Sequence, residues 1–267
     1  MKKIKIDGTR TALVTGASSG MGREFARELV RRGECDALIL VARREGPMKE
    51  LAAELGLPAT VVSADLSTPE GLSTLRGVLE ETKPTLSWLV SAAGYGRFGR
   101  FDEVPDEDVL GMIDLNVKGT VMVTRMAIPY LAPGGHIVEL GSGSVFFPLP
   151  NFNIYASSKA FVYHYSRALR EELKHLKITC TVFCPGWVDT GFFSVADAGG
   201  DDVHKIPLEK RKPLIRADRA VSKCVSAALR GRALCATNWY TKTEHLLSKL
   251  LPAPLMIGMW KSMQNRR

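Results

Sequence analysis

Two side chains near the middle of the chain have the types and the spacing needed to move a proton. Tyr155 and Lys159 are four residues apart in a stretch with helical periodicity, so we expect them on the same face of one helix. A free tyrosine has a pKa of about 10, which is too high for efficient proton exchange near neutral pH. A lysine cation nearby favours the phenolate and is expected to lower that pKa. The pair is therefore predicted to act as general acid toward a ketone or general base toward an alcohol.

Two polar residues earlier in the chain complete a candidate catalytic group. Ser142 follows an apolar run typical of a buried strand, and its hydroxyl is predicted to hold the substrate oxygen beside Tyr155; Ser144 is the alternative. Asn116 lies in a long helical pattern and is a candidate to carry a water relay to Lys159. A structural role in its helix is the other interpretation for Asn116. None of the other tyrosines has a lysine four residues further on.

A glycine-rich segment near the N-terminus has the chemistry of a phosphate-binding loop. Its spacing is G-x-x-x-G-x-G, with an apolar run before it and a helical pattern after it. Glycines allow a tight turn, and the free N–H groups at the start of a helix attract a pyrophosphate. This context predicts a dinucleotide site rather than a structural turn. The residues predicted to contact the cofactor here are Gly16, Ser18, Ser19, Gly20, Met21 and Gly22.

The ends of the next two apolar runs predict which dinucleotide binds. Arg43 and Arg44 stand where NAD-preferring sites carry an acidic residue, and arginine suits the 2′-phosphate of NADP(H) instead. Arg43 is the predicted main partner, assisted by Ser18; solvated surface charge is the alternative. Asp65 and Leu66 are predicted to contact the adenine, with helix capping or turn formation as the alternative for Asp65.

The elements that position these residues follow from the alternation of short apolar runs with helical patterns. We predict strands over 11–16, 37–42, 59–64, 86–92, 136–140, 178–184 and 233–236. We predict helices over 20–32, 47–55, 68–81, 106–131, 154–175 and 217–230, with Thr68 as an N-cap. Continuous apolar strands between helices predict a doubly wound, Rossmann-like α/β parallel sheet, as a single domain over 1–267. Ligands of such sheets bind outside the carboxyl ends of the strands, where the candidate residues fall.

With these motifs in order, the sequence resembles the short-chain dehydrogenase/reductase family, of the single-domain type that prefers NADP(H). The matching residues are 15–22, Asn116, Ser142, Tyr155, Lys159 and 185–190. The resemblance implies a catalytic tetrad of Asn116, Ser142, Tyr155 and Lys159. It also implies that Lys159 holds the nicotinamide ribose and that homodimers or homotetramers form. The segment Pro185, Gly186, Val188 and Thr190 would contact the nicotinamide and its carboxamide.

One segment departs from the pattern of this family. The usual Asn-Asn-Ala-Gly after the fourth strand is here Ser91-Ala92-Ala93-Gly94, so the second asparagine, which braces the sheet, becomes Ala92. Its hydrogen bonds must be replaced or lost, at about 1 kcal/mol each. Ala93 and Gly94 still permit close approach to the cofactor ribose.

The expected substrate end of the site is rich in large apolar side chains. The predicted pocket residues are Ser144, Phe146, Phe147, Trp187, Phe192 and Phe193, with Tyr95 and Phe98 as further candidates. A pocket with such walls suits a hydrophobic carbonyl or alcohol, such as a steroid, bile acid, fatty or aromatic ketone. The alternative is that several of these side chains belong to the hydrophobic core. Residues 191–213 are predicted to be a substrate loop that closes over the site. The apolar tail over 240–267 is expected to pack on the pocket or on a neighbouring subunit, with weak membrane contact as the other interpretation.

Composition limits the remaining functions. The 36 Lys and Arg residues against 28 Asp and Glu give a net charge of +8, but they are dispersed, which argues against nucleic-acid binding. Five cysteines without C-x-x-C and five histidines without ligand spacing predict no metal site and a reducing, cytoplasmic location. The basic N-terminus lacks the apolar core of a secretion signal, and no apolar run suits a membrane span. The sequence thus predicts an NADP-dependent oxidoreductase, with a catalytically silent dinucleotide-binding regulator or scaffold as the alternative.

Overall fold

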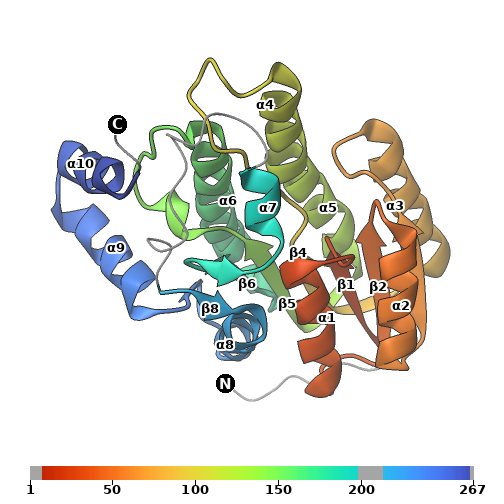
Figure 1. Ribbon diagram of the computed structural model, residues 1–267. Coiled ribbons are helices and arrows are strands. Elements are labelled where there is room, and N and C mark those ends of the chain that lie inside the picture. The colour runs from red at the N-terminus through yellow and green to blue at the C-terminus, as the bar shows by residue number, and fades with distance from the viewer. Residues whose placement is uncertain (1–7, 198–212, 265–267) are drawn as a thin grey trace.

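A parallel sheet of seven strands forms the centre of the computed structural model, which describes residues 8–197 and 213–264 (Figure 1). The strands lie in the order β3-β2-β1-β4-β5-β6-β9. Their bounds are β1 (Arg10–Thr15), β2 (Ala37–Ala42), β3 (Ala59–Ser63), β4 (Thr85–Ser91), β5 (Leu131–Leu140), β6 (Thr179–Cys184) and β9 (Leu234–Ala236). The central strands are apolar along their length because both faces of the sheet are covered. The predicted doubly wound α/β fold is confirmed.

Two layers of helices cover the sheet. On one face α1 (Gly20–Arg31), α2 (Glu45–Leu55) and α8 (Ala217–Leu229) pack against the strands. On the other face lie α3 (Pro69–Thr82), α5 (Thr120–Ala127) and α6 (Asn153–Glu172), whose last turn continues as the 3₁₀ turn η4 (Leu173–Leu176). Thr68 caps α3 as predicted, because its hydroxyl accepts a hydrogen bond from the Gly71 N–H at 3.1 Å.

The connections reverse direction between β1 and β4, and this reversal places the site. The chain runs outward from β1 through β2 to β3, then returns to β4 on the other side of β1. The helices after these two halves therefore leave a crevice at the carboxyl ends of β1 and β4, which is the usual ligand position in open parallel sheets.

The predicted helix over 106–131 is in fact several elements. The segment forms α4 (Asp106–Ile113), a π-helical turn η1 (Asp114–Gly119), α5, and a 3₁₀ turn η2 (Ile128–Tyr130). Helical structure stops there because Pro129 lacks a backbone donor. β5 then begins at Leu131, earlier than the predicted start at residue 136, since Leu131 already pairs with Leu86 of β4.

The C-terminal part adds short elements around the carboxyl end of the sheet. A separate two-stranded parallel sheet joins β7 (Val188–Asp189) to β8 (Ile215–Arg216), and α7 (Phe192–Ala196) follows β7. Of the predicted substrate loop, residues 198–212 lie outside the described part of the chain. The tail forms α9 (Trp239–Leu250) and α10 (Ala253–Met263), separated at Pro252. Within residues 8–197 and 213–264, no helix has the length and apolar character to cross a membrane.

Candidate active site

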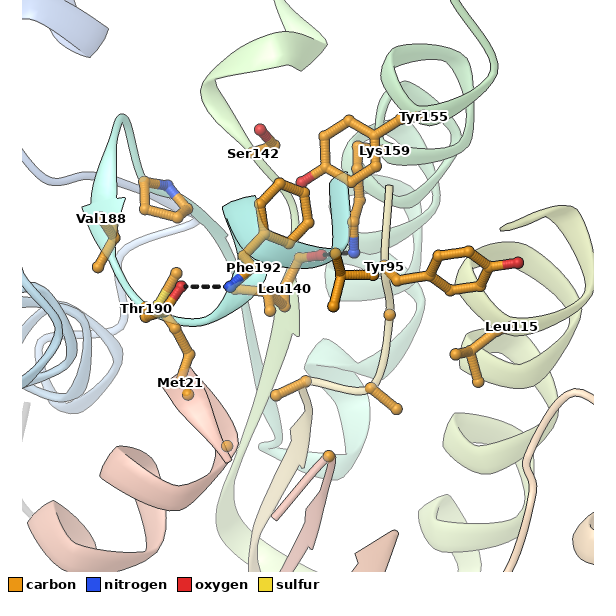
Figure 2. A pocket seen from close by; sticks show the side chains of 18 of the residues that line it. Met21, Tyr95, Leu115, Leu140, Ser142, Tyr155, Lys159, Val188, Thr190 and Phe192 are labelled. Carbon is orange, nitrogen blue, oxygen red and sulfur yellow. Dashed lines mark hydrogen bonds between the residues drawn. The ribbon is translucent and has the colours of Figure 1, made fainter. Parts of the chain in front are cut away.

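A cavity of about 960 Å³ runs along the carboxyl ends of the strands, from the glycine loop to α9. Every residue predicted to contact the cofactor lines this cavity. Figure 2 shows Tyr155 and Lys159 entering it from one helix, with Ser142 and Phe192 near the phenol. Residues far apart in the sequence thus meet because the strand ends lie side by side at one edge of the sheet.

The glycine loop is shaped by close backbone contacts. Gly16 and Gly20 have φ of 68° and 54°, which is left-handed backbone that favours glycine. A Cβ on Gly16 would lie 3.0 Å from the Ala92 carbonyl oxygen, and one on Gly22 would collide with the Gly16 carbonyl oxygen. The first turn of α1 carries no acidic residue, and Ser19 makes no side-chain cap. The first N–H groups of α1 are therefore left for an anion, and this backbone cradle fits a pyrophosphate.

Charged side chains follow the ends of β2 and β3. The Arg44 guanidinium donates to the Ser18 hydroxyl at 3.3 Å, and Arg43 Nη1 lies 3.8 Å from Asp65 Oδ2. Asp65 Oδ1 accepts hydrogen bonds from the backbone N–H and hydroxyl of Ser67, at 3.0 and 2.6 Å. Partial burial opposes ionisation of Asp65, but the Ser67 hydrogen bonds and the Arg43 charge lower its pKa. Asp65 therefore forms the turn before α3 and also borders the cavity.

Tyr155 and Lys159 share one face of α6, as their spacing predicted. Both side chains are buried and both line the cavity. Lys159 Nζ lies 6.0 Å from the centroid of the Tyr155 ring and donates a hydrogen bond of 2.8 Å to the Leu140 carbonyl. The end of β5 thus holds the ammonium group in place beside the phenol.

The electrostatics of this pair differ from the sequence-based expectation. Burial raises the pKa of Tyr155 to about 12, and a hydrogen bond with Ser142 opposes this only in part. Burial also lowers the pKa of Lys159 to about 8, although the nearby Glu139 carboxyl opposes that shift. The Tyr155 pKa is therefore raised and not lowered as the sequence predicted, because the loss of hydration outweighs the hydrogen bond with Ser142. At neutral pH the phenol is protonated, which is the state that can donate a proton.

Ser142 lies two residues after the end of β5 and is the N-cap of the 3₁₀ turn η3 (Gly143–Val145). Its Oγ accepts a hydrogen bond of 3.2 Å from the Ser144 N–H, and the Gly143 N–H donates to the Pro185 carbonyl at 2.7 Å. These bonds fix the serine hydroxyl on the Tyr155 side of the cavity. A carbonyl oxygen placed there could accept hydrogen bonds from both Ser142 and Tyr155.

Asn116 lies in η1 and is fully buried outside the cavity lining. Its Nδ2 donates to the Tyr95 carbonyl at 2.9 Å and to Ser158 Oγ at 3.0 Å, while its Oδ1 accepts from the Tyr95 N–H at 3.1 Å. A Cβ on Gly94 would lie 2.7 Å from Asn116 Oδ1 and 3.1 Å from Lys159 Nζ. The contacts of the Asn116 side chain therefore brace the loop after β4 against α6, beside Lys159.

The backbone around Ala92 is held by a side chain of β1. Thr15 Oγ1 accepts hydrogen bonds from the backbone N–H groups of both Ala92 and Ala93, at 3.0 and 3.1 Å. Because Thr15 is fully buried, this hydroxyl is the group that satisfies two backbone donors at the floor of the cofactor site.

Most of the predicted substrate residues meet at one end of the cavity. Phe147, Trp187, Phe192, Phe193 and Ser144 line it, and the Phe192 ring lies 5.3 Å from that of Tyr155.

Two of the aromatic candidates lie elsewhere. Phe146 points away from the cavity and packs between Tyr163 and His245, with ring centroids 6.0 and 4.8 Å away. The turn η3 directs neighbouring side chains to different sides, which separates Phe146 from Phe147. Phe98 is core and stacks on Phe152, with their ring centroids 3.9 Å apart.

The tail contributes cavity residues that the sequence did not single out. Trp260 of α10 donates from Nε1 to the Pro150 carbonyl at 2.8 Å and lines the cavity. The other lining residues missed from the sequence include Leu115, Leu149, Phe152, Tyr240 and Glu244. The sequence predicted that the tail packs on the pocket. Apolar periodicity, however, does not show which side chains of the tail reach the cavity.

Comparison with known proteins gives one consistent family. A sequence model described as "short chain dehydrogenase" matches residues 10–199. The 11-beta-hydroxysteroid dehydrogenase A of Sesamum indicum is 33% identical over 251 residues, covering 88% of this chain and 70% of that protein. A solved short-chain dehydrogenase from Sphingobium yanoikuyae in complex with NADPH is similar with a TM-score of 0.75 and 26% identity, over 97% of this chain and 98% of that one. A short-chain dehydrogenase/reductase from Burkholderia phymatum in complex with NAD shares the fold, with a TM-score of 0.78 and 20% identity, over 99% of each chain.

Proposed function

This chain belongs to the short-chain dehydrogenase family of oxidoreductases, and on that premise we propose that it interconverts a ketone or aldehyde and an alcohol on a hydrophobic small molecule, using NADP(H). The observation that carries the proposal is the meeting of Ser142, Tyr155 and Lys159 in the same cavity as the glycine loop. A proton-transfer group and a dinucleotide cradle in one cavity are what hydride transfer to a carbonyl requires.

The preference for NADP(H) is supported by the charges at the end of β2. Ser18, Arg43 and Arg44 all border the cavity where the adenosine ribose of a dinucleotide would lie, and Arg44 is already bonded to Ser18. Charge-assisted hydrogen bonds from two guanidinium groups suit a 2′-phosphate. The sequence places no acidic residue between Ala42 and Arg44 to repel it.

The proposed proton transfer uses groups already positioned in the structure. When bound, the nicotinamide supplies or accepts the hydride at the carbonyl carbon. Ser142 and Tyr155 hold the substrate oxygen, and the protonated phenol of Tyr155 gives its proton to that oxygen during reduction. Lys159, fixed by the Leu140 carbonyl, stabilises the phenolate that remains. Asn116 keeps the loop that carries Gly94 in contact with Lys159.

The substrate end favours an apolar molecule. Its walls are Phe147, Trp187, Phe192, Phe193 and Trp260, and such surroundings bind steroid-like, fatty or aromatic ketones through burial of apolar area. The name of the relative from Sesamum indicum points to the same substrate class. We propose that the protein is cytoplasmic and that it forms a homo-oligomer. Light scattering of the purified protein measures its molar mass and so tests the assembly.

Absorbance at the reduced-nicotinamide band, followed with a panel of ketones, tests the reaction. We expect Tyr155→Phe to lose about 10²–10⁴-fold in turnover while NADPH binding changes little, because only the proton donor is removed. Tyr130→Phe, outside the cavity, is the matched control. Wild-type turnover by Tyr155→Phe would refute the mechanism. NADPH binding without oxidation by any ketone would favour a dinucleotide-binding regulator instead.

A further inference from the structure

The cavity holds a second set of polar groups at the end closed by α9. Ser144 lines this end from η3, and Glu244 lines it from α9. We propose that Ser144 and Glu244 form a subsite for a second hydroxyl group on the substrate, so that the enzyme acts on hydroxy ketones and the corresponding diols. This inference rests on the proposed function and narrows its substrate class.

Gly143 brings the two groups together. A Cβ on Gly143 would lie 2.9 Å from Thr241 Cγ2 and 3.6 Å from Glu244 Oε2. The absence of a side chain therefore lets α9 pack directly on the turn that carries both Ser142 and Ser144. The Glu244 carboxyl therefore lies near the turn whose neighbouring residues, Ser142 and Ser144, line the same cavity. A substrate oxygen held at Ser142 and a hydroxyl held at Ser144 would be separated by a few bonds.

The hydrogen-bonding capacity of these groups is left largely unused by the protein. Ser144 Oγ is buried and has no hydrogen-bond partner among the described residues. Glu244 makes no ion pair within residues 8–197 and 213–264, whereas Asp108, another carboxylate of the cavity, is paired with Arg97 at 2.9 Å. A buried polar group without a partner is unfavourable, and a ligand that pairs with it removes this cost.

The donor and acceptor pattern fits a hydroxyl group better than an ammonium group. An alcohol oxygen can accept from Ser144 while its hydrogen is donated to Glu244. An ammonium group could donate to both residues, but it has no lone pair and would leave the Ser144 O–H without an acceptor. Burial raises the pKa of Glu244 to about 7, with a hydrogen bond from Tyr240 opposing the shift, so the carboxyl is partly neutral at neutral pH. A partly neutral carboxyl attracts a cation weakly but still accepts a hydrogen bond.

Binding can be measured apart from turnover, because a ketone does not react with the oxidised cofactor. We would titrate the enzyme–NADP⁺ complex by calorimetry with three acetophenones that carry a hydroxyl, a methoxy or an amino group on the carbon next to the carbonyl: α-hydroxyacetophenone, α-methoxyacetophenone and α-aminoacetophenone. The hydroxy ketone is expected to bind at least about tenfold more tightly than the methoxy ketone, which cannot donate. Glu244→Ala should bring this ratio close to one, and Glu244→Gln, which keeps an acceptor oxygen, should retain part of it. Ser144→Ala should weaken the binding of both ketones, because either ligand oxygen can accept from the Ser144 hydroxyl. Glu80→Ala, at an exposed position of α3, should leave the ratio unchanged.

Three results would overturn the subsite. They are failure of the hydroxy ketone to bind, equal binding of the hydroxy and methoxy ketones to the wild type, and a ratio that survives in Glu244→Ala. Tighter binding of the amino ketone than of the hydroxy ketone would overturn the assignment of its ligand. Turnover with NADPH is measured in parallel: hydroxyl-selective binding without NADPH oxidation would refute the proposed function and leave the subsite standing.

Discussion

Replacing Thr15 by valine tests how the floor of the cofactor site is held. The change keeps the shape of the side chain but removes the hydroxyl that accepts from the N–H groups of Ala92 and Ala93, at 3.0 and 3.1 Å. The bond from Ala92 is buried and the bond from Ala93 is partly buried. A buried donor left without a partner costs about 1–3 kcal/mol, and the partly buried donor is expected at the low end of that range. Thr15→Val should therefore lower the free energy of unfolding by about 2–4 kcal/mol, a large part of the roughly 5–15 kcal/mol of a typical domain.

Urea unfolding followed by tryptophan fluorescence and circular dichroism measures this loss. Thr60→Val, on an exposed position of β3, is the matched control and should change stability by less than about 0.5 kcal/mol. Because Ala93 and Gly94 border the cavity, KM for the dinucleotide should rise in Thr15→Val more than kcat falls. A stability equal to that of the Thr60 control would show that the two hydrogen bonds do not replace the missing asparagine.

Other variants test the remaining parts of the site. Replacing Arg43 and Arg44 together by alanine should raise KM for NADPH by about 10–100-fold and leave KM for NADH nearly unchanged; equal losses would refute the assigned cofactor. Gly94→Ala should lower turnover by about 100-fold without unfolding the protein, because the added Cβ displaces Lys159 Nζ; normal kinetics would contradict this. Carbonyl reduction should be retained below pH 8 and fall as the pH rises through the Lys159 pKa of about 8, since the cation is then lost. Glu139 raises that pKa, so Glu139→Gln should move the fall to lower pH, and a shift to higher pH would reverse the assigned sign.

Local patterns in the sequence were sufficient to predict the strands, the helix and the loop that carry the site. The apolar runs located the strands to within a few residues, except for the start of β5, because a strand buried on both faces needs a continuous apolar stretch. The Tyr155–Lys159 spacing placed both side chains on one face, since an α-helix turns once in about 3.6 residues. The glycine spacing marked the loop at 15–22 because only glycine allows its close backbone contacts.

Tertiary structure decided the properties that depend on segments distant in the chain. The pKa of Tyr155 is raised because its ring is buried against Phe152 and Phe192, and no local pattern reveals this burial. The brace from Thr15 to Ala92 joins two strands, and its distances exist only once the sheet has formed.

Packing between distant elements also decided which side chains line the substrate end of the cavity. Phe146 lies away from it, and Glu244 and Trp260 lie on it, because α9 and α10 fold back over η3 and the loop that follows it. The sequence by itself therefore determined the fold, the glycine loop and the shared helix face of Tyr155 and Lys159, because the spacing of these residues is local. Only the tertiary structure decided the hydration, charge state and walls of the site, because these depend on which distant side chains exclude water from it.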